Sequence, residues 1–252
     1  MIGINNIQIF VFVHDQDIVE YYENIKKFNN IPNFKYVFLG NGSIEKIYGI
    51  DNLIIARDLP YNLENYPKMC AYSGWYVLYK NNLIDHEYVN LLEYDVNLNV
   101  NFIPNILNII NSDQSIDFYG YVPFSINNCF LVNENLKGKL NEYYPDLERK
   151  INNKCIKRYI TEWSSTSNST MKKDFFYRYM TESENIFLWM KDFQSVGHEL
   201  ERNLSIFQIL NEDVEVKYIK GMLNHFQLDS HKTQGIFNQN YKEIIKIFNS
   251  GK

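Results

Sequence analysis

The chain has 252 residues, which is enough for one substantial hydrophobic core or for one core with a smaller subdomain. Its composition is that of a globular protein, with 45% hydrophobic, 22% charged and a high 16% aromatic residues. The net charge of −5 argues against nucleic-acid binding, which needs a basic surface. No window approaches the ~20 apolar residues that cross a bilayer.

Cysteine usage and the first residues predict where the protein works. The three cysteines are far apart and form no CxxC pair, which excludes a zinc ribbon and a disulfide framework and favours a reducing compartment. The first apolar run, Ile7–Val13, has no basic flank before it, so we expect no signal peptide. We therefore expect a cytoplasmic protein, and we discount three glycosylation sequons, which begin at Asn41, Asn168 and Asn203.

Strands and one helix alternate in the first part of the chain. Ile7–Val13 is a continuous apolar run, typical of a strand covered on both faces. Asp15 then caps a helix predicted to extend through Phe28, and further strands are predicted at Phe34–Leu39 and Asn52–Ala56. This order predicts a βαβ unit, so the expected fold class is α/β with a Rossmann-like N-terminal half.

Residues just past the ends of these strands are candidate nucleotide ligands, because βαβ units bind ligands at the carboxyl ends of their strands. They are His14, Asp15, Gly40, Arg57 and Asp58. Arg57 would contact a phosphate, and Asp58 a ribose hydroxyl or a base edge. The alternative is that these residues cap helices and form a surface ion pair. Neither GxGxxG nor GxxxxGK(S/T) occurs, which argues against a dinucleotide cofactor and a P-loop NTPase.

A helix is predicted over Pro67–Asn82, with the proline at its start. Lys68, in the first turn, is placed to contact a phosphate. Aromatic residues recur along this helix at a spacing of three to four residues, and we expect them in the core rather than at a ligand: Tyr72, Trp75, Tyr76 and Tyr79.

Two carboxylates end the next strand. Val89–Leu92 is apolar and leads directly into Glu93 and Asp95, whose side chains point the same way in an extended backbone. Two acids on one side are costly unless a positive group lies between them. A Mg²⁺ or Mn²⁺ ion carrying a substrate diphosphate would fit, because these cations take oxygen ligands. The alternative is a strand end whose two acids face water.

A polar loop is predicted at Thr161–Thr170, with Trp163 inside it. A tryptophan among hydroxyl groups suits a sugar ring, whose apolar face stacks on an aromatic side chain. A loop tryptophan packed into the core is an equal alternative. Before this loop, helices are predicted at Phe102–Asn111 and Leu136–Tyr144, strands at Ile116–Val122 and Cys129–Val132, and a turn at Gly120–Phe124.

A long helix at Met171–Lys191 precedes a second helix, Gln194–Leu210, that carries chemistry. His198, Glu201 and Arg202 share one face of that helix, at positions i, i+3 and i+4. Such a set would deprotonate an acceptor hydroxyl and neutralise a leaving phosphate. An ordinary surface ion pair beside a capping histidine is the alternative. The segment is no zinc-protease HExxH, because residue 202 is arginine.

The last strand, Val214–Ile219, leads into a ligand-rich segment. His225 would complete an octahedral metal site with Glu93 and Asp95. His231 and Lys232 would bind phosphate.

The acid-x-acid strand end at Glu93–Asp95, the His225-Phe226 pair followed by Lys232, and the His-x-x-Glu-Arg helix at 198–202 resemble the GT-A-fold nucleotide-sugar glycosyltransferases of small bacterial and large-virus type. The resemblance implies a single domain over 1–252 with a mixed sheet, a nucleotide-sugar-binding half over 1–100 and an acceptor-binding half over 101–252. It implies that Asp95 is the surer metal ligand, since the commonest form of the motif does not have glutamate first.

The function implied is Mn²⁺- or Mg²⁺-dependent transfer of a hexosyl or deoxyhexosyl group from a UDP-sugar to a glycan or another hydroxyl acceptor, in glycan biosynthesis. Uridine comes from the resemblance and from no residue here. His198 and Glu201 are the candidate bases if the reaction inverts the anomeric centre. A viral source would place the protein in the host cytoplasm. Two alternatives are a non-catalytic glycan-binding module and a sugar nucleotidyltransferase, although the latter usually carries a Gly-rich N-terminal loop.

Overall fold

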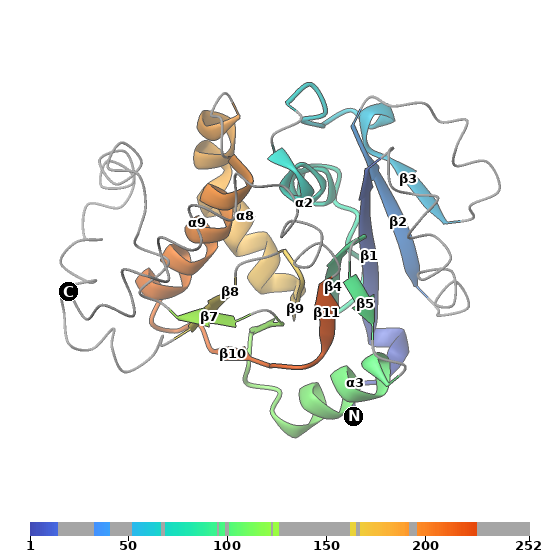
Figure 1. Cartoon of the computed structure of the whole chain (residues 1–252), viewed down its shortest axis with the longest axis vertical. Coiled ribbons are helices and arrows are strands. Elements are labelled where there is room, and N and C mark those ends of the chain that lie inside the picture. The colour runs from blue at the N-terminus through green and yellow to red at the C-terminus, as the bar shows by residue number, and fades with distance from the viewer. Residues whose placement is uncertain are drawn as a thin grey trace.

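The computed structural model describes residues 1–14, 33–40, 52–66, 69–94, 96–98, 101–121, 123–125, 162–164, 167–191 and 196–225. A sheet of seven strands in the order β10-β6-β9-β4-β1-β2-β3 forms its centre (Figure 1). The strands, in chain order, are β1 (Ile7–His14), β2 (Phe34–Leu39), β3 (Leu53–Ile55), β4 (Tyr88–Glu93), β6 (Phe118–Gly120), β9 (Ser169–Lys172) and β10 (Val216–Tyr218).

The N-terminal part of the sheet is parallel and the C-terminal part is mixed. β1 pairs in parallel with β2 and β4, and β2 pairs in parallel with β3. β9 runs antiparallel to both β4 and β6, and β10 is parallel to β6. The predicted α/β class with a mixed central sheet is therefore confirmed, and β1 and β2 agree with the predicted strands almost residue for residue.

Both faces of the sheet are covered, as the continuous apolar run of β1 predicts. Phe10 and Phe12 of β1 face a core built with the helices α2 (Ala71–Lys80), α8 (Lys173–Met190) and α9 (Val196–Leu210). Their neighbours Ile9 and Val11 face a second core with the helix α3 (Phe102–Ser112). The short 3-10 helices η1 (Ile4–Asn6) and η4 (Ala56–Asp58) flank β1 and β3.

The aromatic stripe of α2 belongs to the core, as expected. Trp75 is 0% exposed and packs against Phe176 and Tyr179 of α8, with ring centroids 5.8 and 5.9 Å away. α2 approaches the sheet closely at Gly74, where an added Cβ would lie 2.4 Å from the Phe12 ring.

Helix α2 starts at Ala71 rather than at Pro67, which corrects the predicted start. Cys70 has φ 51° and ψ −140°, a conformation outside the helical region, so the helix cannot extend through it. This left-handed backbone is uncommon for a residue with a side chain and costs free energy that the surrounding packing must offset.

The predicted polar loop at Thr161–Thr170 contains strands instead. Its first part contributes β8 (Glu162–Ser164), which pairs with β7 (Pro123–Ser125) in a small antiparallel sheet, so the predicted turn at Gly120–Phe124 also ends in a strand. The last part of the predicted loop forms the start of β9. The helix predicted to start at Met171 therefore starts two residues later, at Lys173. Another small sheet pairs β5 (Val96–Leu98) with β11 (Leu223–His225). The other predicted elements, 15–28, 129–132 and 136–144, lie outside the described residues.

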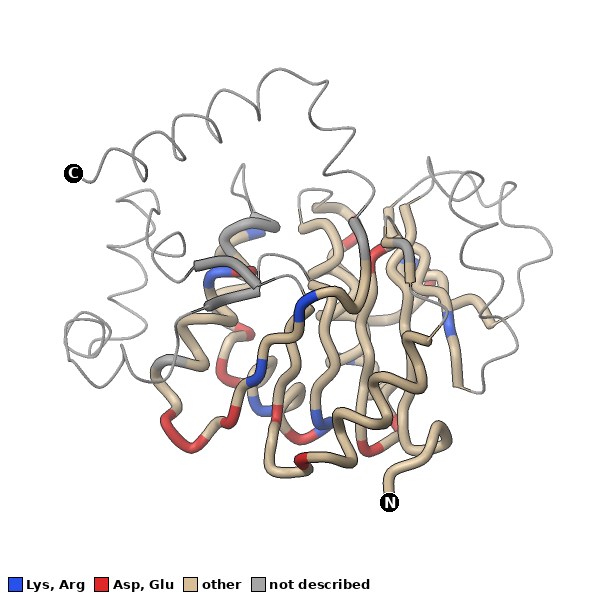
Figure 2. The backbone as a smooth tube through the Cα atoms, turned by 60° about the horizontal axis from the view of Figure 1, so that its bottom comes forward, with Lys and Arg blue, Asp and Glu red and all other residues tan. Residues whose placement is uncertain are grey.

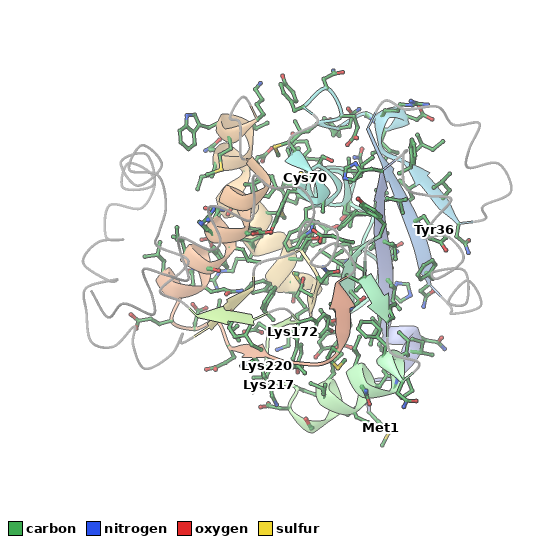
Figure 3. All side chains as sticks on the ribbon, viewed as in Figure 1. Met1, Tyr36, Cys70, Lys172, Lys217 and Lys220 are labelled. Atoms are coloured by element: carbon green, nitrogen blue, oxygen red, sulfur yellow. The ribbon has the colours of Figure 1, made fainter. Side chains whose placement is uncertain are left out.

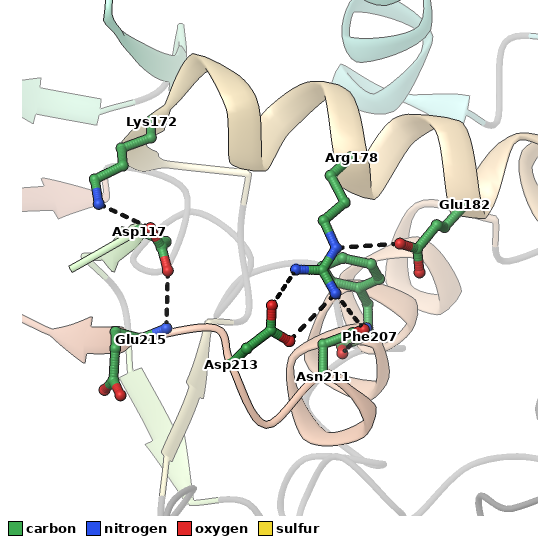
Figure 4. Close-up of polar contacts among 8 residues, drawn as sticks. All are labelled: Asp117, Lys172, Arg178, Glu182, Phe207, Asn211, Asp213 and Glu215. Carbon is green, nitrogen blue, oxygen red and sulfur yellow. Dashed lines mark hydrogen bonds and ion pairs between the residues drawn. The ribbon is translucent and has the colours of Figure 1, made fainter. Parts of the chain in front are cut away.

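Acidic and basic residues are interspersed along the described backbone (Figure 2), and several form ion pairs. Arg178 of α8 donates to Asp213 at 2.6 Å and to Asn211 at 2.7 Å, which ties α8 to the segment after α9 (Figure 4). Lys172 contacts Asp117 at 2.9 Å in the same view. Within the described part of the chain, no helix has the length and apolarity that a membrane span needs.

Candidate active site

The carboxyl ends of four parallel strands meet at one edge of the sheet. His14 ends β1 and pairs with Leu39 of β2, and Glu93 ends β4 opposite Phe12 of β1. The rings of His14 and Tyr94 make an edge contact with centroids 6.0 Å apart. This edge is where a parallel α/β sheet binds ligands, and the other sequence candidates of the N-terminal half follow the same strands.

Arg57 and Asp58 lie in η4, directly after β3, as expected. Their side chains approach each other, with Nε of Arg57 4.0 Å from Oδ1 of Asp58, so the surface ion pair considered as an alternative is present. The Asp58 side chain is 61% exposed. Asp15 and Lys68 lie outside the described residues.

Gly40 and Glu64 form a contact at the end of β2 that the sequence did not reveal. The carboxylate of Glu64, which is 4% exposed, accepts a hydrogen bond from the Gly40 N–H. Burial raises the pKa of Glu64, while the hydrogen bonds from Gly40 and Ser73 act in the opposite direction. Gly40 has φ 89°, which explains glycine at this turn.

Glu93 is held at the end of β4 by two consecutive residues. Its Oε1 accepts a hydrogen bond from Oγ of Ser167 at 2.9 Å, and its Oε2 accepts one from Nδ2 of Asn168 at 3.2 Å. Its main-chain N–H donates to Oδ1 of Asn168 at 2.9 Å. Asn168 is 0% exposed, so the sequon that begins there is inaccessible to glycosylation.

Strand pairing places one predicted metal ligand, His225, close in the fold to the residues that follow β4. Asp95 lies outside the described residues, but the next residue, Val96, opens β5, and β5 pairs with β11 so that His225 lies opposite Val96. The main chain of His225 therefore lies opposite a residue three positions along the chain from Glu93. Among the described residues, which do not include Asp95, no group of three His, Cys, Asp or Glu forms a metal cluster.

The carboxylates of Glu93 and Glu201 both act electrostatically on the thiol of Cys70. Burial, Glu93 and Glu201 together raise the pKa of Cys70 from 9.0 to about 11. Burial, then Glu201 and more weakly Glu93, also raise the pKa of Tyr72 well above its usual value, so the phenol stays neutral. The helix face predicted to serve an acceptor thus lies within electrostatic reach of the strand end predicted to serve a donor.

Cys70 is an exposed residue that directly precedes α2. It lies toward the end of the molecule opposite Met1 (Figure 3). The hydroxyl of Tyr72 is buried, and within the described part of the chain it has no hydrogen-bond partner. Neither residue carried a motif that sequence reasoning could use.

The remaining candidates lie on α9, in β8 or outside the described residues. His198, in the first turn of α9, is placed by its main chain alone, whereas Glu201 and Arg202 follow on the same helix as half-buried residues. Trp163 lies in β8 opposite Phe124 of β7. His231 and Lys232 lie outside the described residues.

Comparisons with known proteins identify the fold. No protein-family model matches the sequence. No curated protein matches it either. A similar solved structure is that of the bifunctional glycosyltransferase WbbM in its apo form, with 16% sequence identity and a TM-score of 0.61 over 88% of this chain and 45% of that one. The chain thus spans about half the length of that protein. At this identity the likeness shows the fold: a mixed α/β, Rossmann-type architecture of the kind found in a glycosyltransferase.

Proposed function

We propose that the protein is a metal-dependent glycosyltransferase of the GT-A type, which moves a hexosyl or deoxyhexosyl group from a nucleotide diphosphate-sugar, with UDP-sugar favoured, to a glycan or another hydroxyl acceptor. The observation that supports the proposal is the β5–β11 pairing, which sets the main chain of His225 opposite Val96, three residues after Glu93. The structural likeness to a glycosyltransferase supports the same reaction class.

The residue types at this edge fit a Mg²⁺ or Mn²⁺ ion. Asp95 would bind it, with Glu93 beside it and His225 completing the set, since carboxylate oxygens are ligands that such cations prefer and imidazole suits Mn²⁺ less strongly. A bound ion supplies charge stabilisation for the leaving diphosphate, typically worth several kcal/mol.

Cationic side chains of the chain itself would bind the donor phosphates. Arg57 follows β3 at the same edge, and Lys68 and Lys232 are the other candidates. His14, Asp15 and Asp58 would contact the nucleoside, and His231 a phosphate. In this scheme residues 1–100 bind the nucleotide-sugar.

The acceptor side is assigned to residues 101–252. Glu201 would take the proton from the acceptor hydroxyl onto its carboxylate, with His198 as the second candidate and Arg202 on the same helix face beside them. Trp163 would stack on a sugar ring. This role for Glu201 requires an inverting reaction, because a retaining one needs no such base.

A donor-hydrolysis screen tests the proposal. We would incubate the protein with UDP-, GDP- and CDP-sugars, with Mn²⁺ or with EDTA, and follow nucleotide release. The expected result is release from one donor only with Mn²⁺, and transfer to an added glycan acceptor that falls about 10²–10⁴-fold in Glu201→Gln. Glu182→Gln, a change of a glutamate paired with Arg178 on α8, is the matched control. No release from any donor would reject the proposal in favour of a glycan-binding module.

A further inference from the structure

Two consecutive residues just before β9 form hydrogen bonds with both carboxylate oxygens and with the main-chain N–H of Glu93. Ser167 donates its hydroxyl to Oε1 of Glu93 at 2.9 Å, and its main-chain N–H lies 3.5 Å from the same oxygen. Asn168 donates Nδ2–H to Oε2 at 3.2 Å and accepts the Glu93 N–H on Oδ1 at 2.9 Å. Both carboxylate oxygens and the main chain of Glu93 are therefore fixed by one dipeptide, which we call the Ser167–Asn168 clamp.

Strand register explains why an asparagine stands there. The antiparallel pairing of β4 with β9 ends at Leu91 and Ser169. Beyond that pair, hydrogen bonds from the Asn168 side chain replace the main-chain pairing. This side chain accepts a hydrogen bond from the main-chain N–H of Glu93 and donates one to the Glu93 carboxylate. Only a carboxamide of this length offers both groups. Aspartate at this position would lack the donor, and leucine would lack both.

A buried polar cluster fixes the strand that carries the clamp. Thr170 of β9 lies opposite Asn90 of β4, and its hydroxyl contacts both Nδ2 of Asn90 and the hydroxyl of Tyr121. All of these side chains are buried. A slip of one residue would turn Thr170 to the other face of the sheet and leave buried polar groups without partners. The cluster therefore specifies one register, and that register sets Ser167 and Asn168 at the end of β4.

The clamp also accounts for glutamate at residue 93. Aspartate would draw the carboxylate back by about 1.5 Å, the length of one carbon–carbon bond, and would lose the contacts at 2.9 and 3.2 Å. Glutamine would keep them. Its Nε2–H₂ can donate to the Ser167 hydroxyl while its Oε1 accepts from Asn168, because a serine hydroxyl both donates and accepts.

We propose that Ser167 and Asn168 are positioning residues of the donor site: they set the direction of the Glu93 carboxylate at the end of β4. The proposal rests on the proposed function, because it assigns the clamp to the nucleotide and metal end of that site. Groups that orient metal ligands typically contribute 10–100-fold to metal affinity.

The test combines two readouts. Calorimetry measures the affinity for UDP, GDP and CDP in Mn²⁺ for wild type, Ser167→Ala, Asn168→Ala, Asn168→Asp, Glu93→Asp and Glu93→Gln. Thermal unfolding measures Tm for the same proteins. It also measures Tm for Glu93→Ala and for the double variant Glu93→Ala/Asn168→Ala, which together with wild type and Asn168→Ala form a double-mutant cycle that needs no nucleotide.

Asn111→Ala is the matched control. Asn111 of α3 also accepts a main-chain N–H, that of Ile2 at 2.7 Å, and donates to the Ile2 carbonyl at 2.8 Å. It lies away from the carboxyl edge, because Ile2 precedes the first residue of β1. We expect it to lower Tm by about 2–4 °C for each kcal/mol that the loss of these contacts costs in a chain of this size, with nucleotide affinity unchanged.

The clamp predicts that Asn168→Ala, Asn168→Asp and Glu93→Asp weaken Mn²⁺-dependent nucleotide binding by about 10–100-fold and that Ser167→Ala does so to a smaller extent. Glu93→Gln, which keeps the clamp contacts, should weaken binding less than Glu93→Asp, which loses them, and the thermal cycle should be non-additive. Clamp variants that lower Tm like the control but keep wild-type affinity would show a purely structural contact and overturn the inference. If wild type binds no nucleotide, the proposed function fails first, and the donor role of the clamp fails with it.

Discussion

Cys70 offers a chemical probe of the electrostatic effect of Glu93 and Glu201 at one thiol. A pKa raised from 9.0 to about 11 leaves about 100-fold less thiolate at pH 8 than an ordinary thiol has, and alkylation proceeds through the thiolate. Because Cys70 is exposed as a residue, water also stabilises its thiolate, so this factor is an upper value. We expect Cys70 to react with iodoacetamide tens of times more slowly than a free thiol at the same pH.

Neutralising either carboxylate should speed the reaction. For charges of order 8 Å apart in an effective dielectric of about 40, Coulomb's law gives about 1 kcal/mol, or about fivefold in thiolate population. Glu201→Gln lowers the pKa of Cys70, so at a fixed pH below that pKa more thiolate is present and the rate rises. Glu93→Gln should act in the same direction.

The assay is mass spectrometry of alkylation between pH 7 and 10, in a chain whose Cys129 and Cys155 are replaced by serine. Glu182→Gln, on the exposed face of α8, is the control for a general change in net charge. A Glu201→Gln rate equal to that of the control would refute the reasoning, because Glu201 of α9 would then not act on the Cys70 thiol.

Two further predictions concern packing and pH. Gly74→Ala places a Cβ 2.4 Å from the buried Phe12 ring, so we expect a loss of about 1–3 kcal/mol in the free energy of unfolding, partly offset by the better helix propensity of alanine. Gly3→Ala, whose nearest contact is at 3.8 Å, should leave chemical denaturation unchanged, and equal midpoints for the two variants would contradict the close approach of α2. Burial raises the pKa of Glu64, so the folded state binds a proton more readily than the unfolded state and stability falls as pH rises through that window. In Glu64→Gln, the fall of Tm with rising pH between pH 4 and 7 should therefore be smaller than in wild type. The same dependence of Tm on pH in both proteins would contradict a raised pKa for Glu64.

The sequence could predict the parallel half of the fold because burial there leaves a clear pattern. A strand covered on both faces must be largely apolar, and in Ile7–Val13 the one polar residue is Gln8, whose buried amide is hydrogen-bonded to the main chain of Leu83 and Asp85. β9 escaped prediction for the opposite reason: Ser169 and Thr170 are polar yet buried, and their partners come from distant strands. The start of α2 was placed too early because the positive φ of Cys70 has no local signature.

The candidate site divides in the same way. Glu93 is a candidate because it ends an apolar strand, and Glu201 and Arg202 are candidates because their helical spacing is local; their roles stay predictions. The contacts of Ser167 and Asn168 with Glu93 could not be predicted, since they depend on a residue of another strand and the sequence around them indicates only a polar segment.

The central claim is a metal-dependent nucleotide site at the carboxyl edge of the sheet. The measurement that tests it most directly is calorimetric titration of UDP, GDP and CDP into wild type and Asp95→Ala, each with Mn²⁺ and with EDTA. We predict that one nucleotide, UDP by preference, binds wild type only with Mn²⁺ and that Asp95→Ala abolishes this binding. Binding that is equal in EDTA, or equal in Asp95→Ala, would contradict the account.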